Sequence, residues 1–178
     1  MKTFTEQDRI KQFEEVMKPC NLPKYIVDDL QNMGFFIAPA SIHHHGAYSG
    51  ALFDHSLAVM NSLLSLTKRL ELKWQREESP YIVGMFHDLC KTDNYQQTND
   101  EAWEYNNATL LPGHGEKSVI LLQQFLDLTQ EEIMCIRWHM GAFDKEENWN
   151  SYGRAVTTYP NVLYTHTADM IAARILGV

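Results

Sequence analysis

The sequence predicts an all-α fold, and three observations support this prediction. Apolar residues recur at helical spacing along most of the chain, strand-like alternation is weak, and stretches with glycine or proline separate the periodic segments. The length of 178 residues is that of one domain, so we expect a single domain over 1–178. Residues 1–40 match no motif and are expected to pack on the rest as a short helical extension. Their alternative role is the surface of a homodimer.

The first half of the chain predicts three helices. Residues 5–19 carry apolar side chains at helical spacing among charged ones. Pro23 can open a second short helix, which Gly34 ends. A loop containing glycine and proline follows, and a long helix is then expected over about 51–72, with leucine, valine and methionine in its buried stripe.

The second half predicts a central buried helix with further helices around it. Pro80 occupies a helix-start position before YIVGMFHDLCK, which is apolar on most sides. The polar segment 91–112 is long for a connection and is expected to be a binding loop or lid, with a short hairpin at WEYN. Three more helices are expected: at 115–126, at 129–138 behind a capping box of Thr129 and Glu132, and from Pro160 to the end, after the irregular stretch 140–159.

The composition indicates a globular protein of the cytoplasm. Apolar residues make up 44% and charged residues 21% of the chain. No window approaches 18 consecutive apolar residues, so no membrane span is expected, and the polar N-terminus is unlike a secretory signal. Cys20, Cys90 and Cys135 form no CxxC pair, so neither a disulfide framework nor a cysteine-rich zinc site is expected.

The charge balance bears on the partner. Lysine and arginine total 15 against 23 acidic residues, which gives a formal net charge of -8. A strong nonspecific grip on DNA or RNA depends on cationic contacts to phosphates. A long nucleic acid is therefore disfavoured, whereas a small phosphorylated ligand that meets a metal ion directly is compatible with this composition.

Side chains that can bind metal fall at intervals of about one helix plus its connection. They are His55, His87, Asp88, His114, His139 and Asp169. Consecutive helices of a bundle can present one such ligand each to a common centre. Imidazole and carboxylate together suit a divalent transition metal, namely Mn, Fe, Ni, Co or Zn, and a carboxylate can bridge two ions. Any one of these histidines is more often an ordinary core or surface residue, but an imidazole and a carboxylate inside an apolar helix are costly unless paired or bound to metal.

The order His, His-Asp, Asp resembles the HD-domain superfamily of metal-dependent phosphohydrolases. The matching segments are GALFDHSLAVM around His55, GMFHDLCK around His87 and Asp88, and HTADMIAAR around Asp169. The resemblance covers roughly residues 43–178 and implies a helical bundle around a metal site. It is most like the HD module of bacterial exoribonucleases that pair this module with an RNA-binding domain, which is missing from this sequence.

The resemblance also implies roles for individual residues. His55, His87, Asp88 and Asp169 would hold a first ion, and Asp88 would bridge to a second ion held by His114 and His139. Asp88 and Lys91, the lysine of HDxxK, would be the catalytic residues, because a metal-bound water attacks phosphorus and Lys91 stabilises charge on the phosphoryl oxygens. Lys91, His166 and His45 are the candidate substrate contacts. Relatives often carry a second histidine where this chain has Met140.

These observations favour hydrolysis of a phosphomonoester or phosphodiester, with a nucleotide or short oligonucleotide as substrate. Two alternatives stay open. Some HD-type folds with the same ligand types are di-iron oxygenases, and a non-catalytic regulatory module could keep the metal site for stability or ligand sensing. His114 precedes a helix start and is also a candidate phosphate contact in place of a metal ligand. The aromatic residues expected to lie in loops over the site are Tyr48, Trp103, Tyr105, Trp149 and Tyr152.

Overall fold

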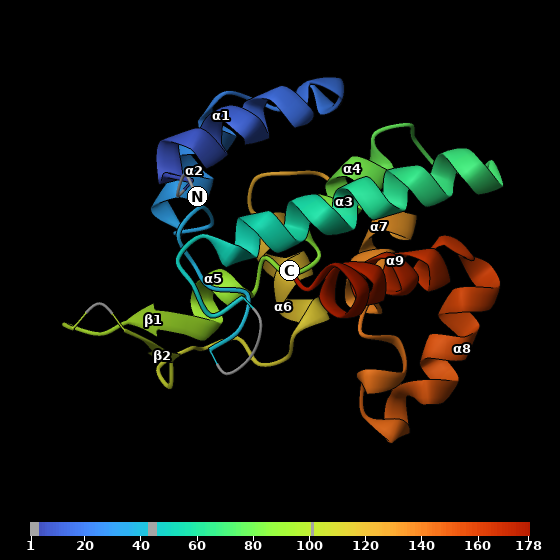
Figure 1. Cartoon of the computed structure of the whole chain (residues 1–178). Helices are drawn as coiled ribbons and strands as arrows, with labels where there is room; N and C mark the ends of the chain where they lie inside the picture. Colours follow the sequence, from blue (N-terminus) through green and yellow to red (C-terminus); the bar gives the residue numbers. More distant parts are fainter. Residues whose placement is uncertain (1–3, 43–45, 101) are drawn as a thin grey trace.

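Helices make up nearly all of the regular structure, as the sequence predicts (Figure 1). The computed structural model describes residues 4–42, 46–100 and 102–178. Its α-helices are α1 (Glu6–Val16), α2 (Tyr25–Asn32), α3 (Ala51–Leu70), α4 (Ser79–Phe86), α5 (Lys91–Asn94), α6 (Gly115–Leu122), α7 (Gln130–Arg137), α8 (Trp149–Thr158) and α9 (Asn161–Met170). A π-helical segment, η4 (Ile171–Leu176), continues α9, and short 3-10 turns lie at η1 (Lys18–Cys20), η2 (Gly141–Phe143) and η3 (Glu146–Asn148).

The long helix α3 runs through the middle of the molecule (Figure 1) and packs against α4, α9 and η4. Gly84 in α4 allows the closest part of this contact, because a Cβ atom there would lie 2.4 Å from Met60 Cα of α3. Ordinary carbon contacts are about 3.5–4.0 Å, so no larger residue fits between these two helices as they stand. The pair carries His55 on α3 and His87 at the end of α4.

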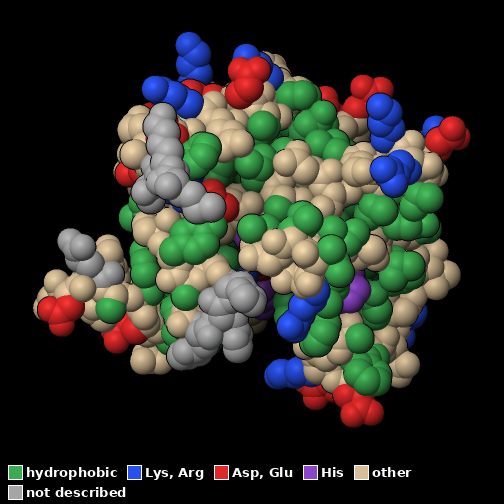
Figure 2. Space-filling model, in the orientation of Figure 1, with side chains coloured by type: hydrophobic (Ala, Val, Ile, Leu, Met, Phe, Trp, Pro, Cys, Tyr) green, Lys and Arg blue, Asp and Glu red, His purple; other side chains and the backbone are tan. Residues whose placement is uncertain are grey.

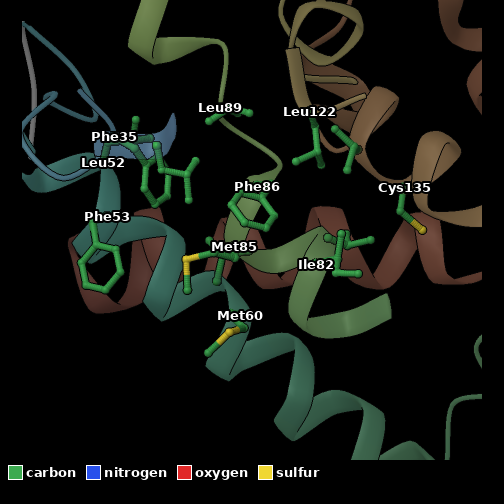
Figure 3. Close-up of a cluster of buried hydrophobic side chains, with 14 of the residues drawn as sticks. Phe35, Leu52, Phe53, Met60, Ile82, Met85, Phe86, Leu89, Leu122 and Cys135 are labelled. Atoms are coloured by element: carbon green, nitrogen blue, oxygen red, sulfur yellow. The ribbon is translucent and has the colours of Figure 1, made fainter. Parts of the chain in front are cut away.

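Aromatic side chains join the N-terminal helices to the centre of the molecule. Phe13 of α1 packs edge-on against Phe36 and against Phe86 of α4, with ring centroids 5.6 and 6.1 Å apart. Both Phe13 and Phe86 are almost fully buried. The same core continues through Leu52, Met60, Ile82 and Cys135, which lie together in Figure 3.

One segment that the sequence analysis left irregular is a helix. The stretch 140–159 contains α8, Trp149–Thr158. Tyr152, Ala155, Val156 and Tyr159 pack against the core, and their spacing of three, four and seven residues is that of one helix face. The prediction was wrong because the polar and glycine-containing surroundings obscured this stripe.

The expected central helix over 80–91 is also shorter than predicted. Helix α4 ends at Phe86, and the backbone tightens through bonds from Leu89 N to Phe86 O and from Lys91 N to Asp88 O. The amide of Cys90 instead donates to Ser118 Oγ of α6, 3.0 Å away. This tertiary contact, which local sequence does not reveal, lets His87 and Asp88 face the interior together.

The polar segment after α5 forms the expected hairpin. Strands β1 (Tyr95–Gln97) and β2 (Trp103–Tyr105) are antiparallel, with Gln96 opposite Glu104. The base of this excursion is fixed by Lys117 of α6, which is fully buried. Its ammonium group pairs with Asp93 and donates to Asn94 and Thr109, on both sides of the hairpin.

The remaining helix boundaries differ from the prediction by a few residues. Helix α1 stops at Val16, before the 3-10 turn at Pro19, and α6 stops at Leu122. The capping box of Thr129 and Glu132 opens α7 as predicted. Among the described residues, no helix is both long and apolar enough to cross a membrane.

Candidate metal centre

Five separate segments deliver the predicted ligands to one place. His55 lies in the second turn of α3, His87 and Asp88 follow α4, His114 precedes α6, His139 follows α7 and Asp169 lies near the end of α9. His55, His87, Asp88 and His139 are buried, whereas the side chains of His114 and Asp169 are 30% and 16% exposed. We call these six residues the His/Asp cluster.

The first part of the cluster surrounds His55. Its Nε2 atom lies 3.3 Å from His87 Nε2 and 3.2 Å from Asp169 Oδ1. Asp88 Oδ2 is 3.6 Å from His55 Nε2 and 3.5 Å from His87 Nε2. The ligand atoms of His55, His87 and Asp169 are close enough together to share one ion.

The second part of the cluster lies on the other oxygen of Asp88. Asp88 Oδ1 is 2.8 Å from His114 Nε2 and 3.3 Å from His139 Nε2. The two oxygens of one carboxylate therefore face two different pairs of histidines. This arrangement suits a carboxylate that bridges two cations.

The orientation of three rings is fixed by their other nitrogen. Nδ1 of His55, His87 and His139 lies 2.9, 2.9 and 2.7 Å from the carbonyl oxygens of Val178, Gly84 and Ile136. A carbonyl oxygen only accepts, so each Nδ1 carries the proton and, in the neutral ring, Nε2 presents a lone pair to the cluster.

These lone pairs test whether a metal ion fits. His139 Nε2 is buried and has no hydrogen-bond partner within the described residues. The lone pairs of His55 and His87 also face one another across 3.3 Å. Unpaired buried acceptors cost about 1–3 kcal/mol each. A divalent cation would remove this cost, because it accepts the lone pairs of all these atoms. The donor set of imidazole nitrogen and carboxylate oxygen fits the metals that the sequence predicts.

His114 differs from the other rings in its second partner. Its Nδ1 lies 3.0 Å from Sγ of Cys90, the second residue after Asp88. Burial lowers the pKa of His114, but the Asp88 carboxylate raises it by more, to about 10. A cation bound at this ring would therefore replace a proton.

The two carboxylates of the cluster are ionised. Burial raises the pKa of Asp88, but Lys91 and the neighbouring rings hold it well below its usual range. Burial also raises the pKa of Asp169, and contact with His55 lowers it to about 2. Lys91 Nζ lies 2.6 Å from Asp88 Oδ2, and this pairing raises the lysine pKa despite burial, so Lys91 is a cation beside the centre.

A cavity of about 390 Å³ opens onto the cluster. His55, Asp88, Lys91, His114 and Asp169 form its polar floor. Its walls are the largely apolar residues Ala40, Ser41, Tyr95, Met140, Phe143, Met170, Ala173, Arg174 and Val178. Histidine side chains are visible on this face of the molecule between hydrophobic and cationic ones (Figure 2). A cavity of this size and character is typical of a small-molecule site.

Among the described residues, His166 and the aromatic residues predicted to cover the site do not line the cavity. Nδ1 of the partly buried His166 lies 2.8 Å from the carbonyl oxygen of His139, to which it donates, and His166 is not among the described residues that line the cavity. His45 lies outside the described residues. The aromatic residues expected to cover the site do not line this cavity either, within the part of the chain that the structure describes; Tyr95 and Phe143 do.

Sequence analysis missed Cys90, Phe143, Arg174 and Val178. Only Cys90 had a local signal, since it lies two residues after Asp88. The others reach the cavity through the turn after α7 and the segment after α9, and no spacing rule predicts that these two regions meet.

Comparison with known proteins supports the general chemistry. No family model and no solved structure matches the chain. The chain is similar to the dihydroneopterin 2',3'-cyclic phosphate phosphodiesterase of Methanocaldococcus jannaschii, with 27% identity over 113 residues. The match covers 55% of this chain and 45% of that protein, so this chain spans less than half of the relative's length. Together with the His/Asp cluster, the similarity supports a phosphohydrolase in general, and it does not extend to the exoribonuclease subtype.

Proposed function

We propose that this protein is a metal-dependent phosphohydrolase of the HD type that acts on a small phosphate ester, a nucleotide or short oligonucleotide. One observation carries the proposal: the buried carboxylate of Asp88 directs its two oxygens at two separate groups of histidine nitrogens, and Asp88 Oδ1 and His139 Nε2 have no other partner among the described residues. The similarity to a phosphodiesterase favours phosphate chemistry at such a centre.

Each residue then has a role in holding the reactants. His55, His87 and Asp169 would hold one divalent ion, His114 and His139 a second, and Asp88 both. Bound ions at such a centre lower the pKa of water towards neutrality and polarise a phosphoryl group. Lys91 lines the floor of the cavity beside Asp88 and is protonated, so it would orient the phosphoryl oxygens and balance their charge.

The test combines metal analysis with a substrate panel. The purified protein should bind close to two ions of Mn, Co, Ni, Fe or Zn per chain. It should also hydrolyse at least one member of a panel of nucleotides, 2',3'-cyclic nucleotides, cyclic dinucleotides and short RNAs. Asp88→Ala should abolish both metal binding and turnover, and His114→Ala should lower the metal count to about one.

Asp28→Ala, a change at an exposed carboxylate of α2, is the matched control and should alter neither measurement. Full turnover by Asp88→Ala would contradict the assignment. Oxygen uptake with a mixed-valence di-iron spectrum would favour the oxygenase alternative. Metal binding without turnover of any ester, with Asp88→Asn lowering only thermal stability, would favour the regulatory module.

A further inference from the structure

The cavity above the His/Asp cluster has an aromatic residue that the protein leaves uncovered. Phe143 lines this cavity, yet 61% of its surface is exposed. Burial of apolar area is what makes a phenylalanine stabilising, so this ring contributes little to the folded state. Ligand pockets are lined largely by apolar and aromatic side chains, so an uncovered ring in this cavity is available to a ligand.

The position of Phe143 is tied to the cluster itself. His139 lies four residues earlier, and the intervening Gly141 has φ +55 and packs against the ring of His166, since a Cβ there would lie 2.7 Å from His166 Cγ. His166 in turn donates to the carbonyl of His139. On the other side, Asp144 pairs with Arg137 at 2.7 Å and accepts from Asn148. The backbone is thus held on both sides of the exposed ring.

The charges of the cavity limit the ligand to few phosphates. Among the described lining residues, the lysine and arginine side chains are Lys91 and Arg174. Lys91 is already paired with Asp88, whereas Arg174 of η4 is exposed and makes no ion pair or hydrogen bond within the described residues. The walls also present Met140, Met170 and Ala173, which offer nothing to a polyphosphate chain.

We infer that Phe143 is a specificity-determining residue that stacks on the planar base of a nucleoside monophosphate whose phosphate lies over the His/Asp cluster. The inference rests on the proposed function, and it adds that the group released from the phosphate is a nucleoside. An exposed aromatic ring accepts any base, because every base has a π-face. The protein therefore prefers phosphate esters that carry a base to esters of the sugar alone, whichever base it is.

The experiment compares two ribose 5-phosphate esters, one with a base at C1 and one with a hydroxyl there. Adenosine 5'-monophosphate should have a lower KM than ribose 5-phosphate. Phe143→Ala should raise the KM for adenosine 5'-monophosphate roughly 5- to 150-fold, which corresponds to the loss of one stacked base. It should leave the KM for ribose 5-phosphate and both kcat values unchanged, and Phe143→Trp should restore discrimination. Tyr25→Ala, which removes a ring of similar exposure on α2, is the control.

A second measurement separates this inference from the proposed function. Adenosine has no phosphate, so its dissociation constant, measured by equilibrium dialysis, does not depend on turnover. Phe143→Ala should weaken adenosine binding by the same factor, even if neither phosphate ester is hydrolysed. Equal binding of adenosine by the wild type and Phe143→Ala, or an equal KM change for both esters, would overturn the inference and leave the phosphohydrolase assignment untouched.

Discussion

Replacing Gly84 with alanine is expected to separate α3 from α4 and to displace two residues of the cluster. The added Cβ would lie 2.4 Å from Met60 Cα and 2.9 Å from Met60 N, both backbone atoms that cannot rotate away. Ordinary contact requires about 3.5–4.0 Å, so the helices must shift by about 1 Å. His55 lies five residues before Met60, and the Gly84 carbonyl accepts from His87 Nδ1, so the shift reaches both rings.

The size of the effect follows from two opposing contributions. Overpacking a well-packed interior costs about 1–3 kcal/mol, and alanine returns about 0.8–1 kcal/mol of helix propensity. The net loss of unfolding free energy should be about 0–2 kcal/mol, which lowers Tm by up to about 8 °C in a chain of this size. Metal affinity should fall as well, because displacement by about 1 Å of groups that must act together is costly.

The matched control is Gly153→Ala in α8, where an added Cβ meets no atom within 4 Å. This variant gains helix propensity without a clash, so its Tm should rise by about 2–4 °C. Thermal unfolding followed by circular dichroism, with metal titration of each variant, measures both quantities. A Gly84→Ala protein as stable as Gly153→Ala, with unchanged metal affinity, would refute the reasoning.

Three further predictions concern neighbouring contacts. Cys90→Ala removes the partner of His114 Nδ1 and should weaken binding of the second ion about 10- to 100-fold, whereas Cys90→Ser should keep most of the affinity; equal calorimetric titrations would contradict this. Lys117→Met removes the contacts of the buried ammonium group to Asp93, Asn94 and Thr109 and should cost roughly 1.5–3 kcal/mol in urea unfolding. An unchanged midpoint would exclude the anchoring role. Burial raises the pKa of Asp144, but its contact with Arg137 helps to lower it below its usual value, so the stability that Asp144 contributes is present above about pH 4 and is lost as pH falls further. The difference in unfolding free energy between wild type and Asp144→Asn should therefore shrink below about pH 4. A difference that grows on acidification would show the sign to be wrong.

The helices could be predicted because their signals are local. Apolar spacing, the proline starts and the Thr129–Glu132 capping box place most helices within a few residues. The turn after α4 could not be predicted, since it depends on Ser118 accepting from the Cys90 amide across 28 residues. Helix α8 could have been found from Tyr152 and its three partners, had polar surroundings not outweighed a regular stripe.

The candidate site divides in the same way. The His/Asp residues are recognisable because each lies at a helix end or on an apolar face, where burying a polar group without a partner costs free energy. The cavity walls are not recognisable, because only the tertiary structure brings Phe143 and Arg174 to the same cavity. The ligand roles, the homodimer and the cytoplasmic location stay predictions.

The buried ammonium group of Lys117 has a consequence for how such a protein could diversify. It contacts Asp93 and Asn94 at the start of the hairpin excursion and Thr109 at its end, so it holds the two ends of the excursion together. Changes in the length or sequence of that excursion would leave the contacts of Lys117 and the polar floor of the cavity in place. The hairpin could therefore vary in length among related chains without moving the His/Asp cluster.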